Sequence, residues 1–157
     1  MDKILSFIVD ENKKLLLLKG SPNDPQFRKS FWYVVTGKCE KGDKTREDTV
    51  IREIAEETGL KNINNIIYLN WIFEYNSLGI ECIEYSYITF VKNEEIILNE
   101  ENIDYKWCDL EEFIEKIYWF GEKKELKKIL ELAINKKLYF KNEKIEYLKP
   151  RYFKANP

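Results

Sequence analysis

The amino-acid sequence predicts an α/β fold, an α/β/α sandwich in which helices cover both faces of a mixed β-sheet. The 157 residues are 44% hydrophobic and 15% aromatic, which suits one folded domain with a sizeable core. Strand-like and helix-like runs mix along the chain without regular βαβ alternation, which argues against a doubly wound parallel sheet. No linker, repeat or low-complexity segment interrupts the chain. We therefore expect a single domain over residues 1–157, with residues 137–157 as a C-terminal extension packed on it.

The N-terminal part of the chain is predicted to form strands joined by turns. Residues 3–9 and 13–18 are short apolar runs around a polar turn, a pattern typical of a β-hairpin. A segment dense in turn-forming residues follows at 20–25 and leads to a further strand at 31–36. We expect this turn-rich loop to border a ligand site.

A helix is predicted over residues 46–58. Thr45 is a plausible N-cap, and Glu47 and Asp48 place acidic side chains in the first turn, where the helix dipole favours them. Gly59 can adopt the left-handed conformation that commonly ends a helix. Both boundaries of this helix are therefore predicted from local residues alone.

The second half of the chain should complete the sheet and add two helices. In its longest strand, Tyr85 and Tyr87 alternate with Glu84 and Ser86, a pattern typical of a strand with one apolar face. Two strands at residues 66–75 and 80–91, an acidic loop at 93–102, a short strand at 105–108 and helices at 110–117 and 122–135 are expected in that order.

Three carboxylates on the predicted helix indicate a cation site. At about 100° per residue, Glu53, Glu56 and Glu57 fall within an arc of roughly 100°, and Ile51 and Ile54 should cover much of the opposite side and pack. Clustered carboxylates repel one another unless a divalent cation neutralises them, and ligation by oxygen alone suits Mg²⁺ or Mn²⁺ rather than zinc. Solvated acidic surface is the alternative for an isolated pair of glutamates.

Composition excludes several other kinds of site. Histidine is absent, which excludes a Ser/His or Cys/His catalytic arrangement. Cys39, Cys82 and Cys108 are odd in number and widely spaced, which indicates reduced thiols in the cytoplasm rather than a disulfide framework or a zinc site. The net charge of −2 gives no general attraction to nucleic acid, and no apolar run is long enough to span a membrane.

The segment from Gly37 to Leu60 resembles the signature of the Nudix hydrolases: Gly, five residues, Glu, seven residues, then Arg-Glu-apolar-any-Glu-Glu-any-Gly-apolar. From Arg52 onward every fixed position matches. Residues 31–37 and 101–107 also look like the bacterial dihydroneopterin triphosphate and dATP pyrophosphohydrolase branch. The resemblance implies a Nudix-type α/β/α sandwich and a Mg²⁺-dependent enzyme that cleaves a phosphoanhydride bond of a nucleoside triphosphate or related small nucleotide and releases pyrophosphate.

The first half of this signature departs from the pattern. Five residues separate Gly37 from Asp43, which places Asp43 at the glutamate position of the signature. Eight residues rather than seven then separate Asp43 from Arg52. Counting back from Arg52 places Lys44 there instead. An inserted residue just before Thr45 favours Asp43 as the functional equivalent, whereas Lys44 would bring a positive charge into the site and slow the reaction.

The resemblance implies roles for the carboxylates and for Arg52. Glu53, Glu56 and Glu57 match metal-binding positions, and Glu53 could also act as the catalytic base. Arg52 would hold a carboxylate in one rotamer through a bidentate contact.

Some Nudix relatives recruit a further carboxylate from outside the signature, as a metal ligand or as a base. Glu101 matches that place, and Glu100 is the close alternative. Trp32, Phe73 and Tyr75 are candidates to stack on a base or pterin, although aromatic residues in strands more often lie in the core. The expected substrate-binding residues are Gly37, Lys38, Trp32, Phe73 and Lys19, and Arg28 is a further candidate for a phosphate contact.

Three alternatives remain open at this stage. The protein could hydrolyse dinucleoside polyphosphates or the 5′-pyrophosphate of RNA, and the basic, aromatic segment at residues 136–157 could bind RNA. It could also be a nucleotide-binding protein with weakened catalysis, as the departure from the signature at Asp43 and Lys44 suggests. A monomer or homodimer that does not contact a membrane is expected.

Overall fold

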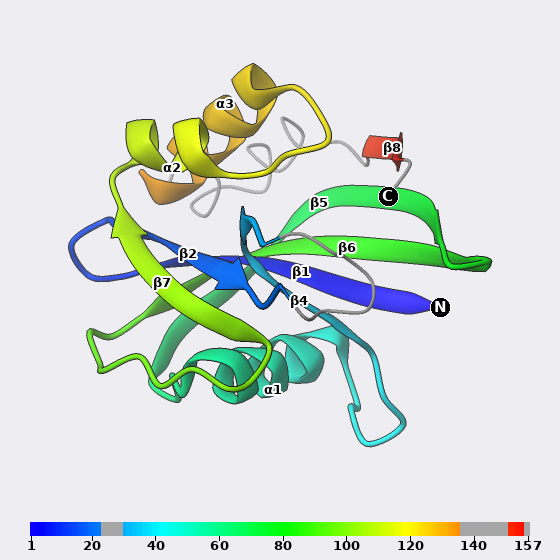
Figure 1. Ribbon diagram of the computed structural model, residues 1–157, viewed down its shortest axis with the longest axis horizontal. Coiled ribbons are helices and arrows are strands. Elements are labelled where there is room, and N and C mark those ends of the chain that lie inside the picture. Colours follow the sequence, from blue (N-terminus) through cyan, green and yellow to red (C-terminus); the bar gives the residue numbers. More distant parts are fainter. Residues whose placement is uncertain (23–29, 136–150, 156–157) are drawn as a thin grey trace.

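The computed structural model describes residues 1–22 and 30–135, and the backbone of residues 151–155. In the described residues an eight-stranded mixed sheet has α1 on one face and α2 with α3 on the other, so the predicted α/β/α sandwich is confirmed (Figure 1). The elements are β1 (Asp2–Val9), β2 (Leu15–Gly20), β3 (Trp32–Tyr33), β4 (Val35–Lys38), α1 (Arg46–Thr58), β5 (Ile63–Ser77), β6 (Ile80–Val91), β7 (Asn102–Cys108), α2 (Leu110–Lys116), α3 (Lys123–Ile134) and β8 (Arg151–Ala155).

Strand β1 lies at the centre of the sheet. It runs parallel to β6 and antiparallel to β4, while β2 pairs with β3 and β7. Strands β5 and β6 form the predicted antiparallel pair, and β8 runs parallel to β5. The rest of the expected C-terminal extension, residues 137–150 and 156–157, lies outside the described residues, as does Arg28.

The N-terminal hairpin is present, but its strands soon separate. β1 and β2 pair at Val9 and Leu15, across a turn in which the Asp10 carboxylate accepts hydrogen bonds from two backbone N–H groups. Beyond this point β2 turns to β3 and β7, and the free edge of β1 is taken by β4. The divergence leaves room for β4 beside β1, where Gly37 of β4 lies against the Glu53 side chain of α1.

The single strand predicted over residues 31–36 is wrong in one respect, because the run forms two strands with different partners. β3 pairs with β2 through Trp32 and Tyr33, whereas β4 pairs with β1, with Gly37 opposite Ile4. Buried Val34 lies at the change of partner. An extended backbone continues through the break, so the sequence pattern gives no sign of it.

Helix α1 begins and ends where its capping residues predict. The Thr45 hydroxyl accepts a hydrogen bond from the Asp48 N–H at 3.1 Å, and the Asp48 carboxylate accepts one from the Thr45 N–H at 3.0 Å, which together form a capping box. At the other end Gly59 adopts φ 75°, and its N–H donates to the Ala55 carbonyl at 2.9 Å.

The predicted orientation of α1 is partly wrong. Val50 and Ile54 are fully buried against the sheet, as expected for an amphipathic helix, but Ile51 is 43% exposed. Glu53 and Glu57 are only 8% and 7% exposed, because the spacing 50, 53, 54, 57 places all four on one helix face. Two of the three carboxylates therefore share the packed side of α1 instead of facing away from it.

Two layers of apolar side chains hold the sandwich together. The larger lies between the sheet and α2 with α3, and includes Phe7, Phe73 and Trp119. The smaller lies between the sheet and α1, and includes Ile54 and Tyr87. No helix among the described residues is long and apolar enough to cross a membrane.

We predict that Gly59→Ala lowers the free energy of unfolding by about 1–2 kcal/mol, because an L-residue is strained at φ 75° and the new Cβ would lie 3.1 Å from the Ile97 Cβ. Chemical denaturation measures this change. Gly42→Ala is the matched control, since a Cβ there meets nothing within 4 Å, and it should change stability by less than about 1 kcal/mol. Equal effects of the two substitutions would contradict the prediction.

Candidate active site

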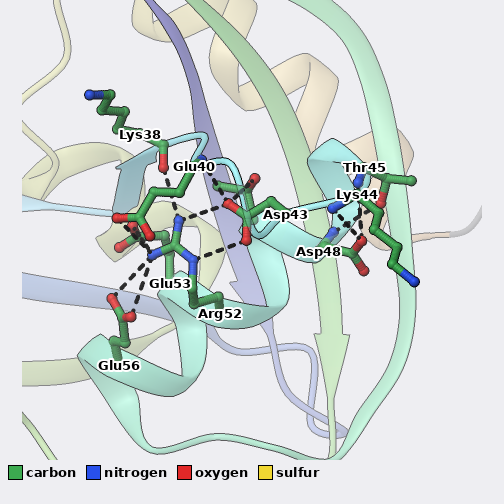
Figure 2. Close-up of polar contacts among 10 residues, drawn as sticks. Lys38, Glu40, Asp43, Lys44, Thr45, Asp48, Arg52, Glu53 and Glu56 are labelled. Carbon is green, nitrogen blue, oxygen red and sulfur yellow. Dashed lines mark hydrogen bonds and ion pairs between the residues drawn. The ribbon is translucent and has the colours of Figure 1, made fainter.

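The guanidinium of Arg52 connects three segments of the chain (Figure 2). Its Nε and Nη2 donate to the two carboxylate oxygens of Asp43 at 3.1 and 2.9 Å, a bidentate contact with the loop that precedes α1. Nη1 donates to Glu53 Oε1 at 2.9 Å, and Nη2 also donates to the Lys38 carbonyl of β4 at 2.9 Å. Arg52 therefore fixes the positions of this loop and of β4 relative to α1.

Asp43, and not Lys44, turns its side chain toward Arg52. The Asp43 carboxylate also accepts hydrogen bonds from the Thr49 hydroxyl and the Glu40 N–H, both at 2.9 Å. The hydrogen bonds from Arg52 hold the pKa of Asp43 well below its usual range, so it stays ionised. The Lys44 side chain points away from Arg52 in Figure 2. The additional loop residue thus lets the Asp43 side chain, which is one methylene shorter than glutamate, reach Arg52.

Gly37 makes room for the carboxyl group of Glu53. A Cβ at Gly37 would collide with the Glu53 side chain at its Cγ, its Cδ and one carboxylate oxygen. The acid is therefore enclosed between α1 and the backbone of β4. Burial raises the pKa of Glu53 to about 7, and the hydrogen bond from Arg52 only partly opposes this effect.

Glu57 lies one helical turn further on and is buried to a similar extent. Its Oε1 accepts a hydrogen bond from the Asn102 side chain at 3.2 Å. Its Oε2 is buried and has no hydrogen-bond partner in the part of the chain that the structure describes. Burial and, secondly, the charge of Glu101 raise the pKa of Glu57. A buried carboxylate oxygen without a partner costs about 1–3 kcal/mol or more, so a bound group that satisfies it would be stabilising.

Two further carboxylates border this pair. Glu56 is exposed and lies 3.4 Å from Arg52 Nη1. Glu101 precedes β7 and is exposed, and its charge raises the pKa of both Glu53 and Glu57. The structure therefore brings Glu101 to the cluster, while Glu100 is an exposed residue of the preceding turn.

The other predicted substrate-binding residues lie in different surroundings. Lys38 is exposed at the end of β4, and the Lys19 Nζ lies 5.7 Å from the ring centroid of half-buried Trp32. Phe73 is fully buried, with Phe120 and Trp119 against it at centroid distances of 4.9 and 5.6 Å. Stacking of a ligand directly on Phe73 is therefore not supported, because its ring belongs to the core.

Sequence reasoning missed Asn102 and Thr49. Asn102 holds Glu57 from β7, and Thr49 holds Asp43 from within α1. Asn102 directly follows Glu101, and this adjacency to a predicted site residue was the only feature of the sequence that pointed to Asn102. Neither contact can be inferred from spacing, because each depends on how a loop returns to the helix.

These residues fit a hard divalent cation. The donor set is carboxylate oxygen alone, and one buried Glu57 oxygen has no hydrogen-bond partner among the residues that the structure describes. Repulsion by neighbouring carboxylates also contributes to the raised pKa values of Glu53 and Glu57. Within the described residues, however, no three or more Cys, Asp or Glu side chains already form a complete metal site. A cation would therefore have to draw the glutamates closer together.

Solved structures of other proteins share this fold. The MutT protein from Methanosarcina mazei is 21% identical with a TM-score of 0.63, covering 89% of this chain and 96% of that one. An Ap4A hydrolase from C. elegans, solved as a binary complex, is 18% identical with a TM-score of 0.64, covering 88% and 98%. The E. coli dihydroneopterin triphosphate pyrophosphohydrolase is 22% identical with a TM-score of 0.58, covering 85% and 95%.

At these identities the similarities establish the fold and do not select a branch, because the dihydroneopterin triphosphate enzyme is one of several comparable neighbours. The sequence model of the NUDIX domain matches residues 2–129, which include the segment from Gly37 to Leu60 and the Arg52 cluster. The chain therefore belongs to the NUDIX domain family, and the prediction of a Nudix hydrolase is confirmed.

Proposed function

We propose that the protein is a Mg²⁺- or Mn²⁺-dependent pyrophosphohydrolase that cleaves a phosphoanhydride bond of a nucleoside triphosphate or related small nucleotide and releases pyrophosphate. The observation that supports the proposal is the buried Glu57 oxygen that lacks a partner among the described residues. It lies with Glu53 and Glu56 in the segment that matches the Nudix signature, and Glu101 adds a further carboxylate from outside that segment. This arrangement is unfavourable without a cation and becomes favourable with one.

Glu53, Glu56 and Glu57 would hold the cation, and Glu101 would contribute from its loop. When bound, a divalent cation neutralises the polyphosphate, polarises the attacked phosphorus and lowers the pKa of bound water. Glu101 lies in the turn before β7, so the site would combine ligands from the helix and from a separate loop.

Glu53 is the best placed proton acceptor. Burial raises its pKa to about 7 in the absence of a cation, and a bound cation would lower it, so Glu53 would act as the base in the arrangement in which Glu56 and Glu57 hold the cation. The Arg52 hydrogen bond and the contact with Gly37 restrict the rotamers of Glu53. Arg52 is thus a positioning residue, and its own charge is already shared with Asp43.

The departure from the signature at Asp43 and Lys44 does not favour a protein with weakened catalysis. Asp43 reaches Arg52 through two hydrogen bonds, so the inserted residue leaves this contact intact. Lys38 and Lys19 remain candidates for phosphate contacts, with Trp32 beside Lys19. The Ap4A hydrolase and the dihydroneopterin triphosphate pyrophosphohydrolase named above differ in substrate, so the substrate of this protein has to be identified directly.

Purified protein with Mg²⁺ should hydrolyse at least one member of a panel of nucleoside triphosphates, dihydroneopterin triphosphate, diadenosine tetraphosphate and 5′-triphosphorylated RNA. Chromatography that resolves pyrophosphate from phosphate identifies the bond that is cleaved. We expect pyrophosphate and a monophosphate from a small triphosphate. Binding of nucleotides without hydrolysis of any of them would refute the proposal.

Glu57→Gln should reduce metal-dependent turnover by more than about 100-fold, because a neutral amide replaces an anionic oxygen at the cation site. Circular dichroism should show an unchanged fold. Glu95→Gln is the matched control, since this exposed glutamate lies outside the cluster, and it should retain full activity. Normal turnover of Glu57→Gln would remove Glu57 from the site.

The stability of the metal-free protein should fall as pH rises from about 4.5 to about 7. The pKa of Glu53 is raised from 4.5 to about 7 and that of Glu57 is also raised, so the folded state binds more protons than the unfolded state in this range. Mg²⁺ should therefore raise the melting temperature more at pH 7.5 than at pH 5. Calorimetry tests this, and an equal shift at both pH values would contradict it.

Gly37→Ala should lower turnover by roughly 100-fold, because the added methyl group displaces the Glu53 side chain with which it would collide. Gly20→Ala is the matched control, because a Cβ at Gly20 meets nothing within 4 Å. Steady-state kinetics of both variants decide the matter. Unaltered turnover in Gly37→Ala would show that the position of Glu53 is not critical.

A further inference from the structure

Two asparagine side chains connect the start of β7 to carboxylates of the proposed cation site. Asn102 is the first residue of β7 and pairs with Gly20 of β2, so the sheet holds its backbone. Asn99 lies three residues earlier, and its carbonyl accepts a hydrogen bond from the Asn102 N–H at 3.4 Å. Both asparagines are half-buried. Asn99 and Asn102 are called the carboxamide pair below.

Asn102 fixes one oxygen of Glu57 and leaves the other unpaired. Its Nδ2 group donates to Glu57 Oε1 at 3.2 Å, while Glu57 Oε2 has no hydrogen-bond partner in the described part of the chain. A carboxylate with one oxygen tethered has fewer rotamers available, so the direction of its second oxygen is restricted as well. Because an amide is neutral, it orients the carboxylate without cancelling the charge that attracts a cation.

Asn99 restricts Glu101 in a similar way. Its Nδ2 group donates to Glu101 Oε2 at 3.3 Å, and its Oδ1 accepts a hydrogen bond from the Glu101 N–H at 3.1 Å. One asparagine side chain therefore contacts both the main chain and the carboxylate of Glu101. The side chain of an exposed glutamate otherwise samples many rotamers in solvent, and this contact reduces their number.

The two tethered carboxylates belong to one electrostatic cluster although they come from separate segments. After burial, the charge of Glu101 is the largest cause of the raised pKa of Glu57, so the two groups lie close enough to interact. Like charges move apart when their side chains are free to turn. The carboxamide pair opposes this separation through one hydrogen bond to each carboxylate. Folding therefore meets part of the free-energy cost of bringing the two carboxylates together.

We propose that Asn99 and Asn102 are positioning residues of the cation site, which keep Glu101 and Glu57 near each other so that both can ligate one divalent cation. Neither asparagine is expected to touch the reacting atoms. Loss of a partner that orients a metal ligand typically costs about 10- to 100-fold in metal affinity. The inference rests on the proposed function, because it concerns the cation of that same site, but it is measured as cation affinity rather than as turnover.

Mn²⁺ binding to the full-length protein without nucleotide tests the inference, with electron paramagnetic resonance to measure the free ion during a titration. Asn102→Leu keeps a side chain of similar size and removes the donor, so it should weaken Mn²⁺ binding by about 10- to 100-fold. Asn99→Leu should weaken it by about 3- to 10-fold, because the Ser21 N–H also holds the Glu101 carbonyl. Asn102→Gln retains an amide donor and should bind Mn²⁺ more tightly than Asn102→Leu.

The matched control is Asn64→Leu, which alters an exposed asparagine of β5 outside the cluster and should leave Mn²⁺ affinity unchanged. Turnover separates positioning from a general loss of structure. Asn102→Leu should need more Mg²⁺ for half-maximal turnover, and saturating Mg²⁺ should restore its kcat to near that of the unaltered protein. A kcat that stays low at every Mg²⁺ concentration would indicate a structural defect and would overturn the inference. If Asn102→Leu does not fold, Asn102→Ala provides the same comparison.

Mn²⁺ affinity separates this inference from the proposed function. If no nucleotide is hydrolysed while Mn²⁺ affinity depends on Asn102, the proposed function fails and the positioning role stands. If nucleotides are hydrolysed and Asn102→Leu binds Mn²⁺ as tightly as the unaltered protein, the proposed function stands and the positioning role is refuted. An equal loss of Mn²⁺ affinity in Asn64→Leu would also refute that role.

Discussion

The burial of Glu53 and Glu57 on the packed face of α1 is the constraint on which the site depends. Ionised carboxylates are costly to bury unless a counter-charge or hydrogen bonds satisfy them. Arg52 provides one positive charge, but Asp43 takes two of its hydrogen bonds and Glu53 a third. Glu57 receives only the Asn102 amide, and one of its oxygens has no partner in the described residues. The cluster therefore has more negative charge than the described side chains neutralise.

The fold brings distant segments to this cluster by backbone contacts. The separation of β1 from β2 gives β4 its place on β1, which sets Gly37 under Glu53. The loop after β6 is fastened to the end of α1, where the Ile97 N–H donates to the Thr58 carbonyl at 2.8 Å. Further on, the Glu101 carbonyl accepts a hydrogen bond from the Ser21 N–H at 2.9 Å. Glu101 is thus placed by main-chain contacts on both sides of its loop.

Features set by local chemistry could be predicted from the sequence. The helix boundaries followed from Thr45 and Gly59, since capping needs only neighbouring residues, and the metal candidates followed from spacing within one helix. Features that depend on which strand or side chain a residue pairs with could not be predicted from the sequence. The break at Val34 leaves the extended pattern unchanged, and the choice between Asp43 and Lys44 depends on which side chain reaches Arg52. Likewise, the burial of Glu84 depends on residues of other strands, among them Tyr75 of β5, whose hydroxyl donates to it.

A crystal structure with Mn²⁺ tests the central claim most directly, because anomalous scattering locates the ion without assumptions about its ligands. The account predicts a strong anomalous peak within coordination distance of the Glu57 oxygen that lacks a partner in the described residues, with Glu53 or Glu56 as a further ligand. Crystals of Glu57→Gln grown under the same conditions should lose that peak. Ordered Mn²⁺ elsewhere, or no peak beside Glu57 in protein that hydrolyses nucleotides with Mn²⁺, would contradict the account.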